Sequence, residues 1–418
     1  WPPAADITII EAQYRGDDSV ARPHKPKSTR SETPPPTATP PKAQTQKAFW
    51  TVESDAVPME LDEKHVPCVP TIEKEFERPF CHNILKIVGT YTSADEDTKK
   101  SIWHALLSYP KNFARATGGS TRQRRRSMRE QLSGARIQVV SSPEVQRSED
   151  TRVARRATTQ TRRKNVGRAA RTLDHMPASF GCDADGFQKK ISDLHPNEPA
   201  LDEHTLAGLR TMTPDVPSTF TVAEVRDASK RTCSGAATGP TAWSDEMIST
   251  LLDDEILAPH VCALLADIAN NNVEASVRAR LTAARFIALP KDGCKIRPIA
   301  IGDSWLKLAA TCQLSKVMPE VRSLFHGLQY GVGERGGAEH IIHHARKLFA
   351  SMPNAAILTL DCTNAFNSVS RAAVAAALLS TQQFASLAPL FMLEYATSSA
   401  LFGDDYQLSS KTAELMEV

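Results

Sequence analysis

Apolar positions recur at helical spacing along most of this chain, and they form short continuous runs in only a few places. In residues 76–113, apolar side chains at 84, 85, 87 and 88 and at 102, 103, 106 and 107 predict two helices that end near Pro110. Thr221 and Glu224 have the spacing of a capping box, which predicts a helix through Lys230. Further helical patterns cover 243–257, 259–271, 304–317, 338–350 and 371–379, and apolar runs predict strands at 284–289, 296–301 and 355–361. Helices interleaved with a few strands indicate an α/β or an α+β fold, of which we expect α+β.

The organisation changes along the chain. Residues 1–70 are rich in Pro, Thr and Lys, and they carry too little apolar surface to offset the entropy of ordering, so we expect disorder there. We expect a small helical segment at 71–114, a basic tract at 115–175 and a larger domain at 176–418.

The net charge is only +2, but the charged residues are unevenly distributed along the chain. From Arg115 to Arg171 there are 16 Lys/Arg and 4 Asp/Glu, an excess of 12 (16 − 4), so the remainder carries −10 (2 − 12). Such a tract favours a polyanion, and the absence of aromatic residues between Phe113 and Phe180 points to phosphate contact rather than base stacking. The candidate nucleic-acid-binding residues are Arg124, Arg125, Arg126, Arg162 and Arg163. A solvated linker or a nuclear-import signal is the alternative.

Neither the cysteines nor the hydropathy indicates a secreted or membrane protein. The eight cysteines include no C-x-x-C pair, so we interpret them as reduced thiols in a reducing compartment. The longest apolar stretch, 372–379, is too short to cross a bilayer, and no signal peptide is evident, so we expect no membrane partner. Because the chain begins with Trp1 instead of Met, we expect it to be a fragment.

Residues 285–299 read as a β-hairpin, since two apolar strands flank an Asp-Gly turn. Lys291, Lys295 and Arg297 crowd its tip and returning strand. Cations on such a hairpin would clamp a triphosphate, with Arg as a bidentate donor and Lys as a point charge. A surface hairpin with ordinary charges is the alternative, and it is the better interpretation if this block is taken alone.

A glycine-rich segment follows at 329–339. Its glycines satisfy G-x-G-x-x-G, but a dinucleotide site also needs a preceding strand and an acid about 20 residues further on. The preceding residues have no clean strand pattern, and Asp361 lies 25 residues after Gly336 (361 − 336). This argues against a dinucleotide site. Because glycine has no side chain, we still expect the backbone at Gly336 and Gly337 to approach a nucleic-acid backbone closely. His340 and His344 lack the Glu and third ligand of a metal site, so we interpret them as a polar helix face.

The run 357–369 reads ILTLDCTNAFNSV, with Asp361 at the end of an apolar strand. Phosphoryl transfer to a hydroxyl is usually driven by two Mg²⁺ ions roughly 4 Å apart, and hard cations take oxygen ligands. Asp361 would supply a carboxylate and Cys362 a backbone carbonyl, while Phe366 would lie under the incoming sugar. A strand-end Asp that caps the following turn is the alternative, and it would be preferred for this block alone.

Four blocks together resemble the reverse transcriptases of non-LTR retrotransposons. They are 238–243 (TGPTAW), the hairpin LPK…RPI at 289–299, the segment QYG…GGAEH at 329–340 and LDCTNAFNSV at 360–369. The amino-acid sequence at 299–310 and 329–340 is most similar to that of site-specific elements of trypanosomatids, including the spliced-leader-associated type. The resemblance covers about 235–400.

The resemblance implies a right-hand polymerase of which 176–418 holds the fingers and an incomplete palm. It implies an RNA-directed DNA polymerase that acts in the nucleus with two Mg²⁺ ions and deoxynucleoside triphosphates, and copies element RNA into DNA at a nicked chromosomal target. By position, Asp361 and Cys362 match metal ligands, Phe366 the sugar gate, and Lys291 and Arg297 the cations of the fingers.

The chain departs from the family's pattern near residue 410. Family members continue with a Gly-Gln-Gly block and then an Asp-Asp pair. Asp404 and Asp405 look like that pair, but they lie only 43 residues after Asp361 (404 − 361) and before any such block. We therefore expect a C-terminally truncated, inactive chain, produced by a frameshift, a premature stop or an incomplete gene model. The alternatives are a non-catalytic nucleic-acid-binding remnant and a working polymerase that uses Asp404 and Asp405.

Overall fold

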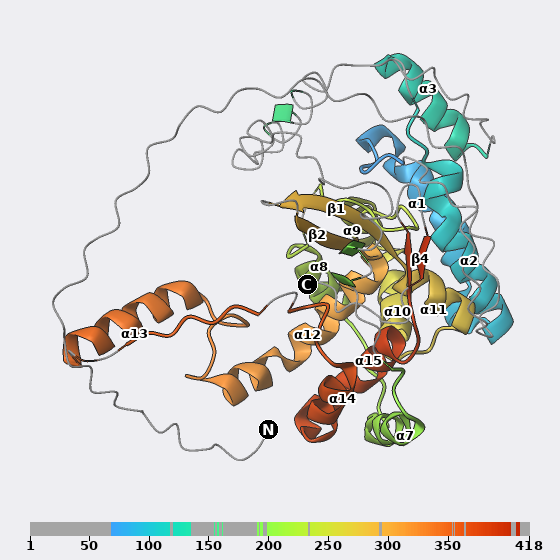
Figure 1. Ribbon diagram of the computed structural model, residues 1–418. Coiled ribbons are helices and arrows are strands. Elements are labelled where there is room, and N and C mark those ends of the chain that lie inside the picture. Colours follow the sequence, from blue (N-terminus) through green and yellow to red (C-terminus); the bar gives the residue numbers. More distant parts are fainter. Residues whose placement is uncertain are drawn as a thin grey trace. The chain divides into compact units, whose positions relative to one another are not determined.

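The computed structural model describes the following part of the chain: residues 68–117, 120–134, 154, 157, 158, 161, 190, 191, 193, 194, 199–232, 235–291, 295–352, 354, 356–362, 365–402 and 407–409. These residues belong to one compact unit, Glu60–Val418. The disorder expected for 1–70 falls almost entirely outside them. The fold is α+β, mostly helical with a small sheet (Figure 1).

Two N-terminal helices confirm the prediction for 76–113. α1 spans Lys74–Val88 and α2 spans Glu96–Phe113, with the short 3-10 helix η1 (Tyr91–Ser93) between them. α2 begins after Asp95, whose carboxylate accepts a hydrogen bond from the backbone N–H of Thr98. This acceptor satisfies one of the free N–H groups of the first turn.

A third N-terminal helix, α3 (Thr121–Leu132), was not predicted. Its five arginines leave few apolar positions, so the periodic signal is weak. A capping box made by Ser120 and Gln123 begins it, and this spacing is the sequence signal from which the helix could have been predicted.

The central helices agree with the predicted ranges in most cases. They are α8 (Val222–Ser229), α9 (Asp245–Asp253), α10 (Ala258–Ala269), α11 (Ala275–Thr282) and α12 (Ser304–Phe325). The predicted capping box of Thr221 and Glu224 is present at α8. α11 was not predicted, and α12 continues past Pro319 instead of ending before it.

One hydrophobic core joins the N-terminal helices to α8–α12. Trp103 of α2 lies edge-on to Trp305 of α12 with ring centroids 6.3 Å apart, and Trp243 lies edge-on to Trp305 at 5.2 Å. All three indoles are at most 2% exposed. The same cluster contains Phe80 of α1, so residues 72–132 and 220–312 fold around shared apolar side chains.

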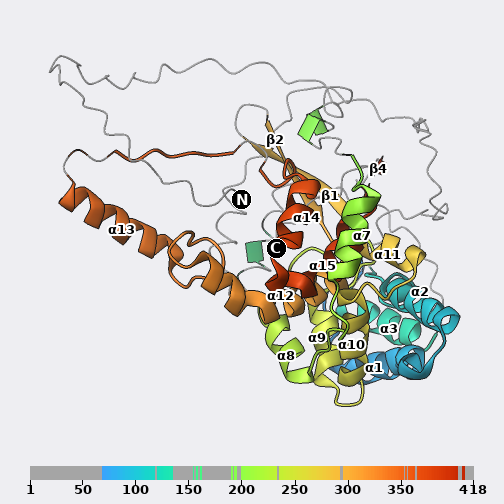
Figure 2. The same ribbon diagram turned by 90° about the horizontal axis from the view of Figure 1, so that it is seen from below.

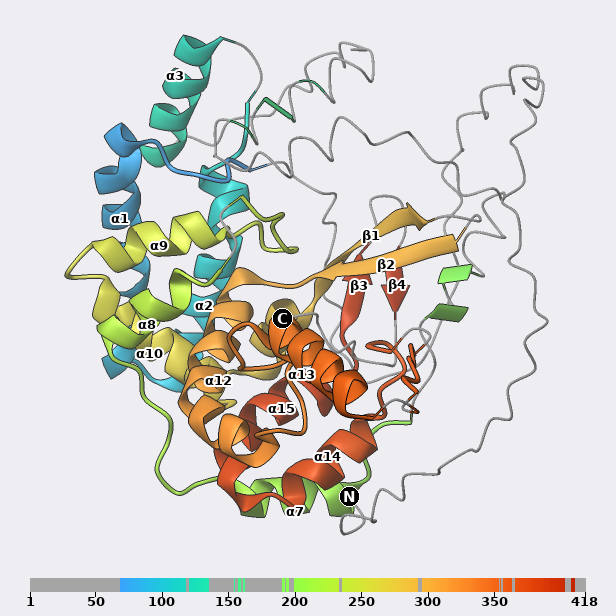
Figure 3. The same ribbon diagram turned by 90° about the vertical axis from the view of Figure 1, so that its left-hand side faces the viewer.

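The sheet has four strands in the order β2-β1-β3-β4. β1 (Ala284–Lys291) and β2 (Lys295–Ile301) form the antiparallel hairpin predicted from the sequence, and Figure 3 shows them side by side. β3 (Ala400–Phe402) pairs in parallel with β1 only at Ala284 and Arg285, and β4 (Gln407–Ser409) pairs with β3. The hairpin therefore extends beyond its partner strand.

A second core lies among α7 (Glu203–Met212), α14 (Arg371–Leu379), the 3-10 helix η2 (Gln382–Leu387) and α15 (Ala388–Tyr395), which gather together in Figure 2. The predicted bounds of α14 are those observed. α13 (Gly337–Ser351) buries only Gly337, and its apolar residues Ile341, Ile342, Leu348 and Phe349 are exposed. Across the described residues, no helix has both the length and the apolar character that crossing a bilayer requires.

Candidate functional site

The β1–β2 hairpin places its cationic positions on one face. Lys291 is the register partner of Lys295, and Leu289 is the partner of Arg297. Since partners share a face and residues two apart in a strand do so too, positions 291, 295 and 297 lie on the same side of the hairpin. Arg297 is exposed, whereas the side chains of Lys291 and Lys295 and the tip at 292–294 fall outside the described residues.

The opposite face of the hairpin is covered by a short helical segment that the sequence analysis missed. Ile191 is 1% exposed and packs with Phe286 (3%) and Ile296 (7%) in a small cluster of its own. Leu194 and Ala288 pack against this cluster. The only sequence signal was an Ile and a Leu three residues apart in a polar stretch.

Two glycines of the segment 329–339 are required by its own backbone conformation and packing. Gly336 has φ +67° at the N-terminus of α13, and a Cβ on Gly337 would lie 1.8 Å from the carbonyl oxygen of Tyr330. The ring of Tyr330 stacks on His340, with centroids 5.9 Å apart. The element before this segment is the helix α12, so the strand that a dinucleotide site requires does not precede it. A role of Gly336 and Gly337 in nucleic-acid contact stays a prediction.

The strand predicted at 355–361 is wrong, because residues 356–362 are neither helix nor strand. Leu358 and Leu360 are 80% and 81% exposed. A strand exists only when a neighbour satisfies its backbone groups, and the register of the described sheet leaves these residues without one. The apolar run alone therefore does not make a strand here.

Asp361 and Cys362 lie exposed on this irregular segment, and Phe366 lies exposed in the turn 365–368. Within the described part of the chain, no three His, Cys, Asp or Glu side chains gather in a way that would hold a metal ion. Asp404 and Asp405 fall outside that part. One carboxylate does not meet the ligand requirement of two Mg²⁺ ions, so we derive no metal-dependent step from this arrangement.

A hydrogen bond connects the turn after Asp361 to the helical segment that packs on the apolar face of the hairpin. Asn367, which follows Phe366, donates its Nδ2–H to the carbonyl oxygen of Leu194 over 3.2 Å. Leu194 in turn packs on the cluster of Ile191 and the hairpin. The structure thus connects two of the four blocks through Ile191 and Leu194.

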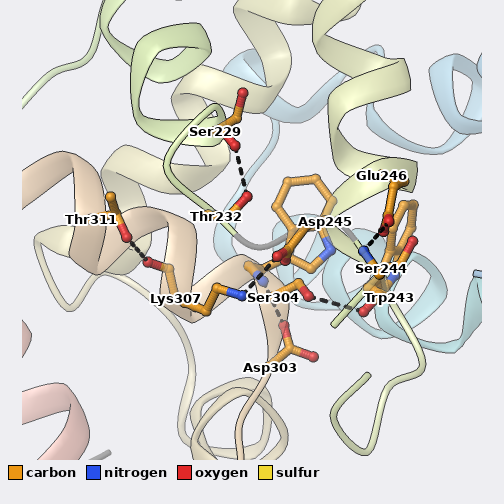
Figure 4. Close-up of polar contacts among 12 residues, drawn as sticks. Ser229, Thr232, Trp243, Ser244, Asp245, Glu246, Asp303, Ser304, Lys307 and Thr311 are labelled. Carbon is orange, nitrogen blue, oxygen red and sulfur yellow. Dashed lines mark hydrogen bonds and ion pairs between the residues drawn. The ribbon is translucent and has the colours of Figure 1, made fainter. Parts of the chain in front are cut away.

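The block at 238–243 is held by polar contacts at the start of α12 (Figure 4). The buried carboxylate of Asp303 accepts hydrogen bonds from the hydroxyl of Thr241 and from the backbone N–H of Trp305. Ser304 donates its hydroxyl to the carbonyl of Trp243 over 3.1 Å. Burial raises the pKa of Asp303 to about 6, although the hydrogen bond from Thr241 opposes this rise. The sequence analysis did not identify Asp303.

Two further contacts tighten this junction. Lys307 of α12 forms an ion pair with Asp245 of α9 over 2.7 Å (Figure 4). A Cβ on Gly239 would lie 2.5 Å from the carbonyl oxygen of Gly302, so only glycine allows the two backbones to approach this closely. Because β2 ends at Ile301, the junction fixes the base of the hairpin on the core.

The arginines of α3 differ in their surroundings. The helix packs on the N-terminal core through Met128, Gln131 and Leu132. Gln131 accepts a hydrogen bond from the backbone N–H of Arg115 over 2.8 Å and donates one to its carbonyl over 3.2 Å.

Arg125 is already paired with two acids, Glu73 at 2.8 Å and Glu75 at 3.1 Å. Arg126 pairs with Glu130 on its own helix, and its side chain is 80% exposed. Arg124 is exposed, and Arg162 and Arg163 fall outside the described residues. Arg122, four residues before Arg126, is exposed on the same helix face.

Part of the chain is similar to a known protein. The chain is 34% identical over 185 residues to the retrotransposable element SLACS 132 kDa protein of Trypanosoma brucei gambiense. The matched residues make up 44% of this chain and 15% of that protein, so the chain spans a small part of the relative's length. No family model matches the chain. The identity supports the resemblance to retrotransposon proteins indicated by the four blocks.

Proposed function

We propose that this chain, a relative of a trypanosome retrotransposable-element protein, is a segment of an RNA-directed DNA polymerase of a non-LTR retroelement. In this proposal the helices α8–α12 and the hairpin are the fingers, and the segment of Asp361 is the first part of the palm. Element RNA, target DNA and deoxynucleoside triphosphates are the partners, and the nucleus is the site of action. The observation that carries the proposal is the 34% identity over 185 residues.

The hairpin supports triphosphate binding within this proposal. Its register places positions 291, 295 and 297 on one face, and Arg297 is exposed there. Three cationic positions on one side suit the polyphosphate of a nucleotide, since Arg gives a bidentate fork and Lys a point charge. The base of the hairpin is fixed by the junction of Asp303, Thr241 and Trp243.

In this proposal, the carboxylate of Asp361 and the backbone carbonyl of Cys362 would be two ligands of Mg²⁺. Phe366 would meet the sugar of the nucleotide. Because the described residues gather no group of three or more potential metal ligands, at Asp361 or elsewhere, we expect the chain alone to be unable to extend a primer.

Primer extension on an RNA template tests this proposal. Wild type, Asp361→Ala, Asp404→Ala and the exposed-acid control Asp215→Ala are compared with Mg²⁺ and all four deoxynucleoside triphosphates. We expect no extension, together with binding of the template–primer duplex that weakens as salt rises. Extension by wild type that is lost only in Asp361→Ala and Asp404→Ala would show a working polymerase. Absence of both extension and duplex binding contradicts the proposal.

A second candidate function, non-catalytic nucleic-acid binding, is favoured by α3. This helix is docked by its buried side, so Arg122 and Arg126 face solvent on a fixed support. Cations held in this way contact phosphates without recognising sequence. Duplex binding that is independent of the hairpin cations would support this function.

A further inference from the structure

The hairpin has little support from the sheet itself. β3 pairs with β1 only at Ala284 and Arg285, and the strand pairing of the hairpin runs from these residues out to Lys291 and Lys295. A two-stranded ribbon is marginally stable in water unless something packs on its apolar face. Some other element must therefore hold the outer half of the hairpin in position.

Ile191 provides that packing. It is 1% exposed, and it contacts Phe286 and Ile296, which lie on the face opposite to the cationic positions. Since Ile296 follows Lys295 directly, Ile191 packs close to the end of the hairpin where the cations lie. The contact lies on the face of the hairpin opposite to Arg297.

The same short segment also binds the turn that carries Phe366. Asn367 donates its amide N–H to the carbonyl of Leu194 over 3.2 Å, and Leu194 packs on the cluster formed by Ile191. Residues 365–368 form a turn, so a hydrogen bond at Asn367 restricts its neighbour Phe366. The segment therefore contacts the hairpin with a side chain and the turn with a backbone carbonyl.

We propose that the described residues 190, 191, 193 and 194 act as a brace that holds the hairpin and the turn of Phe366 in one fixed arrangement. Ile191 and Asn367 are its positioning residues. On the proposed function, the brace sets the distance between the triphosphate-binding cations and the residue that meets the sugar. A nucleotide would then be bound by both parts only while the brace is intact.

Hydrogen exchange of peptides from 284–301, with triphosphate affinity as a second readout, tests the brace. The variants are Ile191→Ala, Asn367→Asp, which removes the donor at nearly constant shape, and Asn367→Gln, which retains a donor. Leu289→Ala, on the cationic face of the hairpin and 41% exposed, is the matched control.

We expect Ile191→Ala to speed exchange in the hairpin about tenfold or more. Asn367→Asp should speed it about threefold. Both variants should weaken triphosphate binding while the denaturation midpoint of the main core is unchanged. Asn367→Gln should recover part of the loss, and Leu289→Ala should match wild type.

One result would refute the brace, and another would separate it from the proposed polymerase function. If Asn367→Asp leaves exchange in 284–301 at the wild-type rate, the turn and the hairpin are not coupled and the brace is refuted. If the coupling is observed but wild type binds no triphosphate, the brace is supported while the proposed polymerase function fails.

Discussion

Trp243 donates its indole N–H to the carbonyl oxygen of Leu106 over 2.8 Å. In a regular helix, that carbonyl would accept from the N–H of the residue four positions later, which is Pro110 in α2. Proline has no N–H, so the carbonyl would otherwise be left without a donor in a buried core. A residue of the block at 238–243 thus completes a helix more than a hundred residues earlier in the chain.

We expect Trp243→Phe to lower the free energy of unfolding by about 1–3 kcal/mol, because a buried acceptor loses its donor. Pro110→Ala restores a backbone N–H at the right position. In that background the same substitution should cost less, which urea denaturation of the four chains in a double-mutant cycle measures. An equal cost of Trp243→Phe in both backgrounds would show that the hydrogen bond does not compensate for the proline.

Asp303 should make stability depend on pH. Burial raises its pKa to about 6 in the folded chain, from 3.8 for the unperturbed group. Between these values the folded state retains a proton that the unfolded chain has lost. The contribution of Asp303 to the free energy of unfolding therefore falls as pH rises from about 4 to about 6 and is constant above.

Asp303→Asn removes this titration and keeps an acceptor for the Trp305 N–H, while the bond with Thr241 reverses, so that the Asn amide donates and the hydroxyl oxygen accepts. The difference in stability between the two chains should change by at most about 1.4 kcal/mol per pH unit within this window. Urea denaturation at intervals from about pH 4 to about pH 7.5 measures it. A difference that stays constant over the whole range refutes the assignment of the carboxyl as buried and titrating.

Gly337→Ala should disrupt the start of α13. The new methyl group would lie 1.8 Å from the carbonyl oxygen of Tyr330, and both groups belong to backbone that cannot move separately. Hydrogen exchange should rise in residues 329–345. Gly331→Ala is the control, because the nearest atom to its Cβ is 3.8 Å away. Equal exchange in the two variants would contradict this packing.

The arginines of α3 should separate into two groups in RNA binding. Arg122→Gln should weaken binding of single-stranded RNA and lower the salt dependence of the affinity by about one counterion, while Arg126→Gln should have a smaller effect because Glu130 already pairs with this side chain. Arg125→Gln should have a smaller effect, since Glu73 and Glu75 already neutralise this side chain. Fluorescence anisotropy over a series of salt concentrations measures both, and equal effects of all three positions would contradict the assignment.

The sequence predicted those parts of the fold whose signals are local. The helix at 371–379 and the capping box of Thr221 and Glu224 depend on spacing within about two helical turns, and both are present. The hairpin was predicted because its Asp-Gly turn and both strands lie within 17 consecutive residues, 285–301. Each of these signals could be evaluated without knowledge of distant neighbours.

The features that were wrongly predicted or missed depend on residues that are distant in the chain. The apolar run before Asp361 looked like a strand, but a strand forms only by pairing with a neighbour, and no strand of the described sheet pairs with residues 356–362. Asp303 and Ile191 were missed because their partners are distant in the chain: Asp303 accepts a hydrogen bond from Thr241, and Ile191 packs on the hairpin. Neither contact leaves a periodic signal in the sequence.

Whether the hairpin binds the triphosphate of a nucleotide is the central question. A photoreactive deoxynucleoside triphosphate, cross-linked to the chain with Mg²⁺ and mapped by mass spectrometry, measures it directly. We expect the label in residues 284–301, lost in the double variant Lys291→Gln with Arg297→Gln and retained in the control Arg210→Gln on α7. Labelling elsewhere, or labelling of the hairpin that persists without its cations, would contradict the account.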